Sequence, residues 1–232
     1  MKNTFVERAF NALNVKYFEK AALPDKAFDY ELNCPLDRQY ILRMMIKQPH
    51  QEFNIPPELK WCEDLIMKSH QMQLDNNIKH SYCYITVRHG IHDAVTEDIW
   101  HTDGYSEIIT HIPEQNYIVT SDYCTEYVEI PLTFPKSFDA LKHNIVEYID
   151  NKVTELQPKI HVAKANVVYV FDPYVIHRRP VEAFGKQRTF VRVTFVPIEV
   201  CDDACYINPN IEKKTYNRNA DTTRNKLTSF EE

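Results

Sequence analysis

The chain contains only three glycines, Gly90, Gly104 and Gly185, among its 232 residues. The phosphate-binding P-loop and the GxGxxG dinucleotide fingerprint both need several glycines within one short loop. The sequence therefore excludes both motifs, and it disfavours the nucleotide-binding α/β folds that depend on them. The 14 Tyr, 12 Phe and 13 Pro instead favour β-strands separated by proline-containing loops.

The first third of the chain has the apolar periodicity of helices. Apolar residues recur at near-helical spacing over residues 4–20, and segments 35–47 and 57–74 each begin with a proline. Segment 35–47 also ends just before Pro49, as helices often do. We therefore expect helices throughout residues 1–78.

From residue 80 onward the pattern changes to that of β-strands. In segment 81–88 (SYCYITVR), one face carries Tyr82, Tyr84, Thr86 and Arg88, and the other carries Cys83, Ile85 and Val87. We expect one face to pack on a core and the other to line a polar cavity. Further strands are predicted at 106–111, 117–121, 127–132, 166–171 and 189–197, with one helix at 137–156 capped by Ser137.

Helices followed by many short strands and one inserted helix predict an α+β domain built on a β-sandwich or barrel. At about 150 residues per domain, the length favours a single unit. We predict one domain over residues 1–207, with a helical part at 1–78 and a β core at about 80–198. Residues 208–232 are polar without apolar periodicity, and we predict that they form a tail.

The charge balance bears on partners and location. The formal net charge is −6, from 27 basic and 33 acidic residues, and nucleic-acid binders usually present a basic face. A nucleic-acid partner is therefore disfavoured. The sequence lacks the run of about 18 apolar residues that a membrane helix needs, and its first twenty residues lack the apolar core of a signal peptide. We expect a cytoplasmic protein without membrane contact.

One short segment, Trp100-His101-Thr102-Asp103-Gly104, has the pattern of a metal site. His101 and Asp103 are two positions apart, so on an extended backbone they point to the same side. His177 follows much later, after an apolar run. Two histidines and one carboxylate on one face of an octahedral metal form the facial triad of non-heme Fe(II) oxygenases, which leaves positions open for a co-substrate and O2.

Two arginines follow His177 in a predicted strand. Arg188 and Arg192 are four positions apart, so both side chains lie on the same face of that strand. The planar guanidinium of arginine matches a carboxylate through two parallel hydrogen bonds. A carboxylate-bearing ligand beside the predicted metal site is therefore favoured.

This combination resembles the Fe(II)/2-oxoglutarate-dependent oxygenase superfamily, in the layout of its taurine-dioxygenase and phytanoyl-hydroxylase branches. The resemblance covers residues 80–198. It implies a double-stranded β-helix (jelly-roll) core with the N-terminal helices packed on it. It also implies that His101, Asp103 and His177 are the iron ligands, and hence the catalytic centre of the domain.

The resemblance also implies roles for residues around that centre. The interval from His177 to Arg188 is common in these branches, so Arg188 is expected to bind the distal carboxylate of 2-oxoglutarate, with Arg192 as the rival. Thr125 stands where some of these enzymes place a threonine on 2-oxoglutarate, and Tyr84 is expected beside it. The residues expected to contact substrate are Arg192, Arg88, Tyr82 and Arg179.

The implied activity is that of a dioxygenase that uses Fe(II), 2-oxoglutarate and O2. It would hydroxylate an unactivated C–H bond of a small-molecule or amino-acid-like substrate and release succinate and CO2. Two alternatives stay open. One is a non-catalytic, cupin-like binding module. The other is a zinc hydrolase that uses the same three residues with Asp172 or Glu182 as its base. The sequence leaves open the identity of the substrate, the choice between hydroxylation and desaturation or cyclisation, and the oligomeric state.

Overall fold

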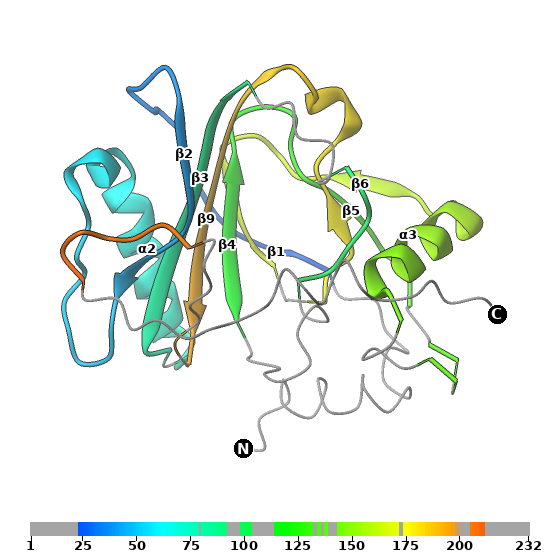
Figure 1. The fold of residues 1–232 in the computed structure, drawn as a ribbon, viewed down its shortest axis with the longest axis horizontal. Coiled ribbons are helices and arrows are strands. Elements are labelled where there is room, and N and C mark those ends of the chain that lie inside the picture. Colours follow the sequence, from blue (N-terminus) through cyan, green and yellow to red (C-terminus); the bar gives the residue numbers. More distant parts are fainter. Residues whose placement is uncertain are drawn as a thin grey trace.

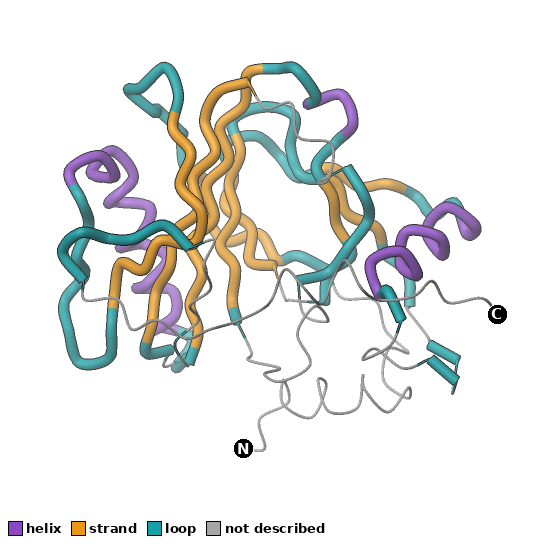
Figure 2. Tube along the Cα trace, viewed as in Figure 1, coloured by secondary structure: helices purple, strands orange, loops and turns teal. Residues whose placement is uncertain are grey.

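The computed structural model describes residues 23–78, 80–91, 98–103, 114–131, 134–135, 137–138, 143–171, 174–197, 199 and 205–211. This part of the chain combines α-helices with two antiparallel β-sheets, which confirms the predicted α+β class (Figures 1 and 2). None of the helices in these ranges has the length and apolar character needed to cross a membrane.

The larger sheet has six strands in the order β1-β7-β4-β9-β3-β2. Their bounds are β1 (Asp25–Asp29), β2 (Gln39–Lys47), β3 (Tyr82–Ile91), β4 (Gln115–Thr120), β7 (Val167–Phe171) and β9 (Gln187–Val196). Every neighbouring pair is antiparallel. The strands predicted at 81–88, 117–121, 166–171 and 189–197 are confirmed as β3, β4, β7 and β9.

The smaller sheet has three strands in the order β6-β5-β8, with β5 (Glu126–Val128), β6 (Ile160–Val162) and β8 (His177–Arg178). The strand predicted at 127–132 is thus shorter than expected. An isolated antiparallel bridge joins His177 of β8 to His101. The smaller sheet therefore brings two of the predicted metal ligands side by side.

Two predicted helices are present, one of them shorter than predicted. Segment 57–74 forms a 3-10 helix (Pro57–Cys62) followed by α2 (Glu63–Asp75). The later helix, α3 (Ile145–Leu156), begins well after Ser137, because Asn144 is its cap and accepts the N–H of Glu147 at 3.3 Å. The helix predicted at 4–20 and the strand predicted at 106–111 lie outside the described residues.

The helix predicted at 35–47 is wrong, because this segment forms β2. Ile41 pairs with Val87, but Met44 pairs with Ile85, so β2 advances three residues while β3 advances two. Arg43 has a φ of 44° within this bulge, and its N–H bonds the Thr86 hydroxyl at 3.1 Å. The extra residue places buried apolar side chains three apart, and this spacing imitates a helix in the sequence.

One face of the larger sheet carries the main core. Cys83, Ile85 and Val87 of β3 lie in one buried cluster with Leu65 and Ile66 of α2. The apolar face predicted for segment 81–88 therefore packs on a core, and the helical segment after residue 57 covers it (Figure 1).

The opposite face of the larger sheet meets the smaller sheet. Ile118 of β4 and Phe171 of β7 pack with Val175, and Tyr127 of β5 joins the same cluster. The ladder registers place Arg192 opposite both Thr86 and Ile118, so this face also presents polar side chains. The polar side chains of β3 and β9 thus lie on the face of the larger sheet that packs against the smaller sheet, which includes His177.

Residues 205–211 pack along β2, beside its bulge (Figure 1). The Tyr206 N–H bonds the Leu42 carbonyl at 2.8 Å. Asn208 is 3% exposed and donates to the carbonyls of Met45 and Asn54 at 2.9 and 2.8 Å. The polarity of this segment did not predict its docking. Residues 212–232 of the predicted tail lie outside the described residues.

Candidate metal centre

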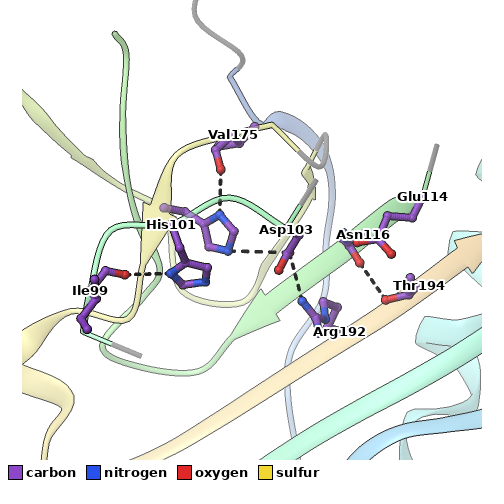
Figure 3. Close-up of polar contacts among 9 residues, drawn as sticks. Ile99, His101, Asp103, Glu114, Asn116, Val175, Arg192 and Thr194 are labelled. Atoms are coloured by element: carbon purple, nitrogen blue, oxygen red, sulfur yellow. Dashed lines mark hydrogen bonds and ion pairs between the residues drawn. The ribbon is translucent and has the colours of Figure 1, made fainter. Parts of the chain in front are cut away.

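The three predicted ligands meet between the two sheets. The side-chain ligand atoms of His101, Asp103 and His177 all lie within 4.8 Å of one another. The backbones of His101 and His177 exchange two hydrogen bonds, of 3.1 and 2.9 Å, and their ring centroids are 4.6 Å apart. The pairing of residues 98–103 with β8 is therefore what assembles the cluster (Figure 3).

Each histidine is oriented by a carbonyl two residues before it. His101 Nδ1 lies 2.7 Å from the Ile99 carbonyl, and His177 Nδ1 lies 2.9 Å from the Val175 carbonyl. A carbonyl only accepts, so both Nδ1 atoms carry the proton and both Nε2 lone pairs are available. A backbone carbonyl on the remote ring nitrogen is the usual companion of a metal-binding histidine.

Asp103 is held by Arg192, whose Nη1 lies 3.1 Å from Asp103 Oδ2. Burial alone would raise the pKa of Asp103, but Arg192, His177, His101 and Arg43 together outweigh it, and Arg192 contributes most. The pKa of Asp103 is therefore held below its ordinary value. The carboxylate stays ionised, the form that a metal needs.

The spacing of these atoms suits a metal ion. His177 Nε2 lies 3.9 Å from Asp103 Oδ2. Two neighbouring ligands with bonds of about 2.1 Å at a right angle would be about 3 Å apart, so a shift of about 1 Å would complete the site. Two imidazoles and one carboxylate form the donor set of an open Fe(II) site.

Four contacts that the sequence did not predict fasten the ligand-bearing segment. The Arg178 guanidinium lies 4.3 Å from the centre of the Trp100 ring and bonds Glu126 at 2.7 Å. The next residue, Arg179, bonds Asp98 at 2.8 Å. The Trp100 N–H bonds the Asp150 carboxylate of α3 at 3.0 Å. Both arginines after His177 therefore tie residues 98–103 to β8.

Arg188 lies on the same face of β9 as Arg192 but has a different environment. Its side chain is buried, and its Nε has no hydrogen-bond partner among the described residues. Burial lowers the pKa of Arg188 to about 9. Its charge also acts on the thiol of Cys124, next to Thr125 in the chain. Arg188 and Thr125 therefore lie in the same region.

The other predicted contacts have mixed surroundings. Tyr84 and Thr125 are buried, and Tyr84 lies opposite Thr194 in the β3–β9 ladder. Burial lowers the pKa of Arg88 to about 10. The charges of Arg192 and Asp103 are among the smaller influences on this pKa. Tyr82 is half-buried at the first position of β3.

Two further charged residues that the sequence did not single out lie close to Asp103. Arg43 comes from the bulge of β2, and Glu114 comes from the residue just before β4. Of the carboxylates suggested as a hydrolase base, Glu182 is exposed and Asp172 lies outside the described residues. The charge of Asp103 instead acts on Glu114, a described carboxylate that the sequence did not suggest as a base.

No protein-family model matches the chain, and no curated protein sequence matches it either. Among solved structures, EvdO2 from Micromonospora carbonacea var. aurantiaca, complexed with 2-oxoglutarate, is 12% identical. Its TM-score is 0.39, over 83% of this chain and 80% of that chain. HygX from Streptomyces hygroscopicus, with nickel and 2-oxoglutarate bound, is 12% identical with a TM-score of 0.39, over 92% and 84%. SnoN, a non-heme alpha ketoglutarate dependent epimerase from nogalamycin biosynthesis, is 10% identical with a TM-score of 0.38, over 83% and 72%.

Proposed function

We propose that this protein is an Fe(II)- and 2-oxoglutarate-dependent dioxygenase. It hydroxylates a C–H bond of a small-molecule or amino-acid-like substrate and yields succinate and CO2. The proposal rests on one observation: two histidines with fixed Nδ1 protons and one ionised carboxylate converge between the sheets. We further propose that the two sheets are the halves of a jelly roll, and that the protein acts in the cytoplasm.

Iron is proposed to bind His101, Asp103 and His177. Bound there, it would supply the activation of O2 and 2-oxoglutarate that insertion of oxygen into a C–H bond requires. The protein's own contribution is orientation. The Ile99 and Val175 carbonyls fix the two imidazole rings, and Arg192 fixes the carboxylate.

Arg188 is proposed to bind the distal carboxylate of 2-oxoglutarate. Burial of a guanidinium is unfavourable unless an anion accompanies it, and no described acceptor bonds its Nε. A carboxylate would supply a charge-assisted, bidentate partner. Thr125 and Tyr84 are proposed to complete this subsite, and both side chains are buried.

The substrate is proposed to contact Arg192, Arg88, Tyr82 and Arg179. Arg192 and Arg179 already bond Asp103 and Asp98. A substrate contact from either arginine would therefore use those of its N–H groups that the carboxylate leaves over, because a guanidinium has five.

The test is an anaerobic titration of the purified protein with Fe(II) and 2-oxoglutarate, followed by a substrate panel read by succinate release. We expect one Fe(II) per chain and loss of binding in His101→Ala and His177→Ala. Full iron occupancy in both variants would refute the proposed centre. Metal binding without succinate formation on any substrate would favour the binding module, and turnover with zinc in place of iron would favour the hydrolase.

A further inference from the structure

Glu114 lies on the face of the larger sheet that looks toward the metal centre. It precedes β4 by one residue, and alternation places it on the same side as Asn116 and Ile118. Ile118 lies opposite Arg192, the residue that bonds Asp103. In the view of Figure 3, Asn116 lies between Glu114 and Asp103.

A chain of two hydrogen bonds holds the Glu114 carboxylate from behind. The Asn116 amide is fully buried and donates to Glu114 Oε1 at 2.9 Å. Its carbonyl oxygen accepts from the Thr194 hydroxyl at 2.7 Å. The reverse amide orientation would point an oxygen at the carboxylate, so the carboxylate sets the direction of the chain. Two residues thus fix a single carboxylate at the edge of the site.

The bond from Asn116 does not use all the hydrogen-bond acceptor positions of the Glu114 carboxylate. Within the described part of the chain, the carboxylate has one hydrogen-bond partner, Asn116, and no ion pair. Glu126, which is buried, shows what a structural glutamate has in this protein, since it bonds Arg178 at 2.7 Å. A carboxylate offers about four acceptor positions, so Glu114 keeps capacity for a ligand.

The charges around Glu114 link it to the metal centre. Burial raises the pKa of Glu114, and the negative charge of Asp103 raises it further, whereas Arg43 and Arg192 act in the opposite direction. The charges of the Asp103 and Glu114 carboxylates therefore interact. Because Ile118 pairs with Arg192, a group bound by Glu114 would lie on the same face of the larger sheet as the arginine that bonds Asp103.

We propose that Glu114 is a substrate-binding residue that accepts a hydrogen bond from an ammonium or hydroxyl group of the substrate. This inference rests on the proposed function, since it assigns a polar, donor-bearing substrate to the same site. Asn116 and Thr194 act as positioning residues for the carboxylate. The substrate is accordingly a primary amine or a polyol rather than a purely apolar molecule.

The test uses the full chain loaded with Co(II) and 2-oxoglutarate, which allows binding to be measured without turnover. The probes are ethanolamine, L-amino acids, glycerol, myo-inositol and glucose, each compared with an analogue in which methyl replaces the donor hydrogens. Binding is read from the visible spectrum of Co(II) and from the melting temperature. We expect at least one amine or polyol to bind wild type and its methylated analogue to bind less.

Glu114→Ala should then weaken that probe by roughly 10–100-fold, the loss typical of a hydrogen bond to a charged group, and Glu114→Asp should recover part of it. Glu114→Gln preserves the shape if the alanine variant fails to fold. The Gln variant should retain most of the affinity for a hydroxyl probe and lose the affinity for an ammonium probe. Glu155→Gln is the matched control, because Glu155 is 65% exposed on α3.

Two results would overturn the inference. One is unchanged probe affinity in Glu114→Ala. The other is that no amine or polyol binds while Co(II) and 2-oxoglutarate do. If Co(II) and 2-oxoglutarate themselves fail to bind wild type, the proposed function fails instead, and the two failures are thereby distinguished.

Discussion

Replacing Arg188 and Arg192 one at a time separates two roles that their shared strand face leaves open. The Nε atoms of Arg188 and Arg192 both lack a described partner, but Arg192 bonds Asp103 through Nη1 at 3.1 Å, whereas Arg188, which is 6% exposed, has no ion pair among the described residues. We expect Arg188→Ala to weaken 2-oxoglutarate binding by about 2–4 kcal/mol, or roughly 30–1000-fold. Its metal affinity should be nearly unchanged, because none of the described contacts of Arg188 involves His101, Asp103 or His177.

The same pair of variants should differ in stability without ligands. Arg188→Ala removes a buried charge with no described carboxylate partner, so relief of desolvation offsets the cavity that truncation leaves. Arg192→Ala leaves the Asp103 carboxylate without its ion-pair partner, and both of these side chains are close to nine-tenths buried in wild type. Removing one partner of a buried ion pair costs about 3–5 kcal/mol. We therefore expect Arg192→Ala to be the less stable variant.

Calorimetric titration of 2-oxoglutarate into the Ni(II)-loaded variants measures the first effect, and urea denaturation of the metal-free variants measures the second. Lys68→Ala is a suitable control, because Lys68 pairs with Asp64 on the exposed face of α2. The reasoning is refuted if Arg192→Ala abolishes 2-oxoglutarate binding while Arg188→Ala binds it like wild type.

Three further predictions follow from single contacts. Arg192→Gln should raise the depressed pKa of Asp103. The stability that this carboxylate contributes is lost as pH falls through its folded pKa. Acid unfolding, followed by circular dichroism, should therefore begin at a higher pH in the variant than in wild type. Asn208→Ala removes two hydrogen bonds to backbone carbonyls and should lower the free energy of unfolding by about 1–3 kcal/mol in urea, with unchanged stability arguing against the docked segment. Asp98→Asn weakens the tie to Arg179 and should lower Ni(II) affinity several-fold by calorimetry, whereas equal affinity would show that this tie does not position the ligands.

The sequence predicted the convergence of His101, Asp103 and His177 better than the fold around them, and the reason is the range of the contacts. His101 and Asp103 are neighbours in the chain, so period-two geometry alone brings their side chains to one side. His177 could be added because the chemistry needs a third ligand. The partners that fasten these residues, such as Asp98 for Arg179, come from distant segments and have no local motif.

β2 and Glu114 show two other limits of predicting structure from the spacing of apolar and polar residues. A bulge at Arg43 changed the spacing of buried residues from two to three, and a single inserted residue was enough to make a strand resemble a helix. Glu114 precedes a strand that we predicted only from residue 117, so its alternation with Asn116 was not visible. A strand predicted to start three residues earlier would have placed this carboxylate on the polar face.

The ligand geometry also implies that metal binding is coupled to the pairing of the smaller sheet. His101 and His177 lie on separate segments that, within the described residues, are joined by two backbone hydrogen bonds. The Arg178–Trp100 contact and the Arg179–Asp98 ion pair flank that bridge on both segments. Separation of residues 98–103 from β8 would move one histidine and the carboxylate away from the other histidine together. A metal that needs all three therefore stabilises the paired arrangement by mass action, and these side-chain contacts hold the pairing in register before the metal arrives.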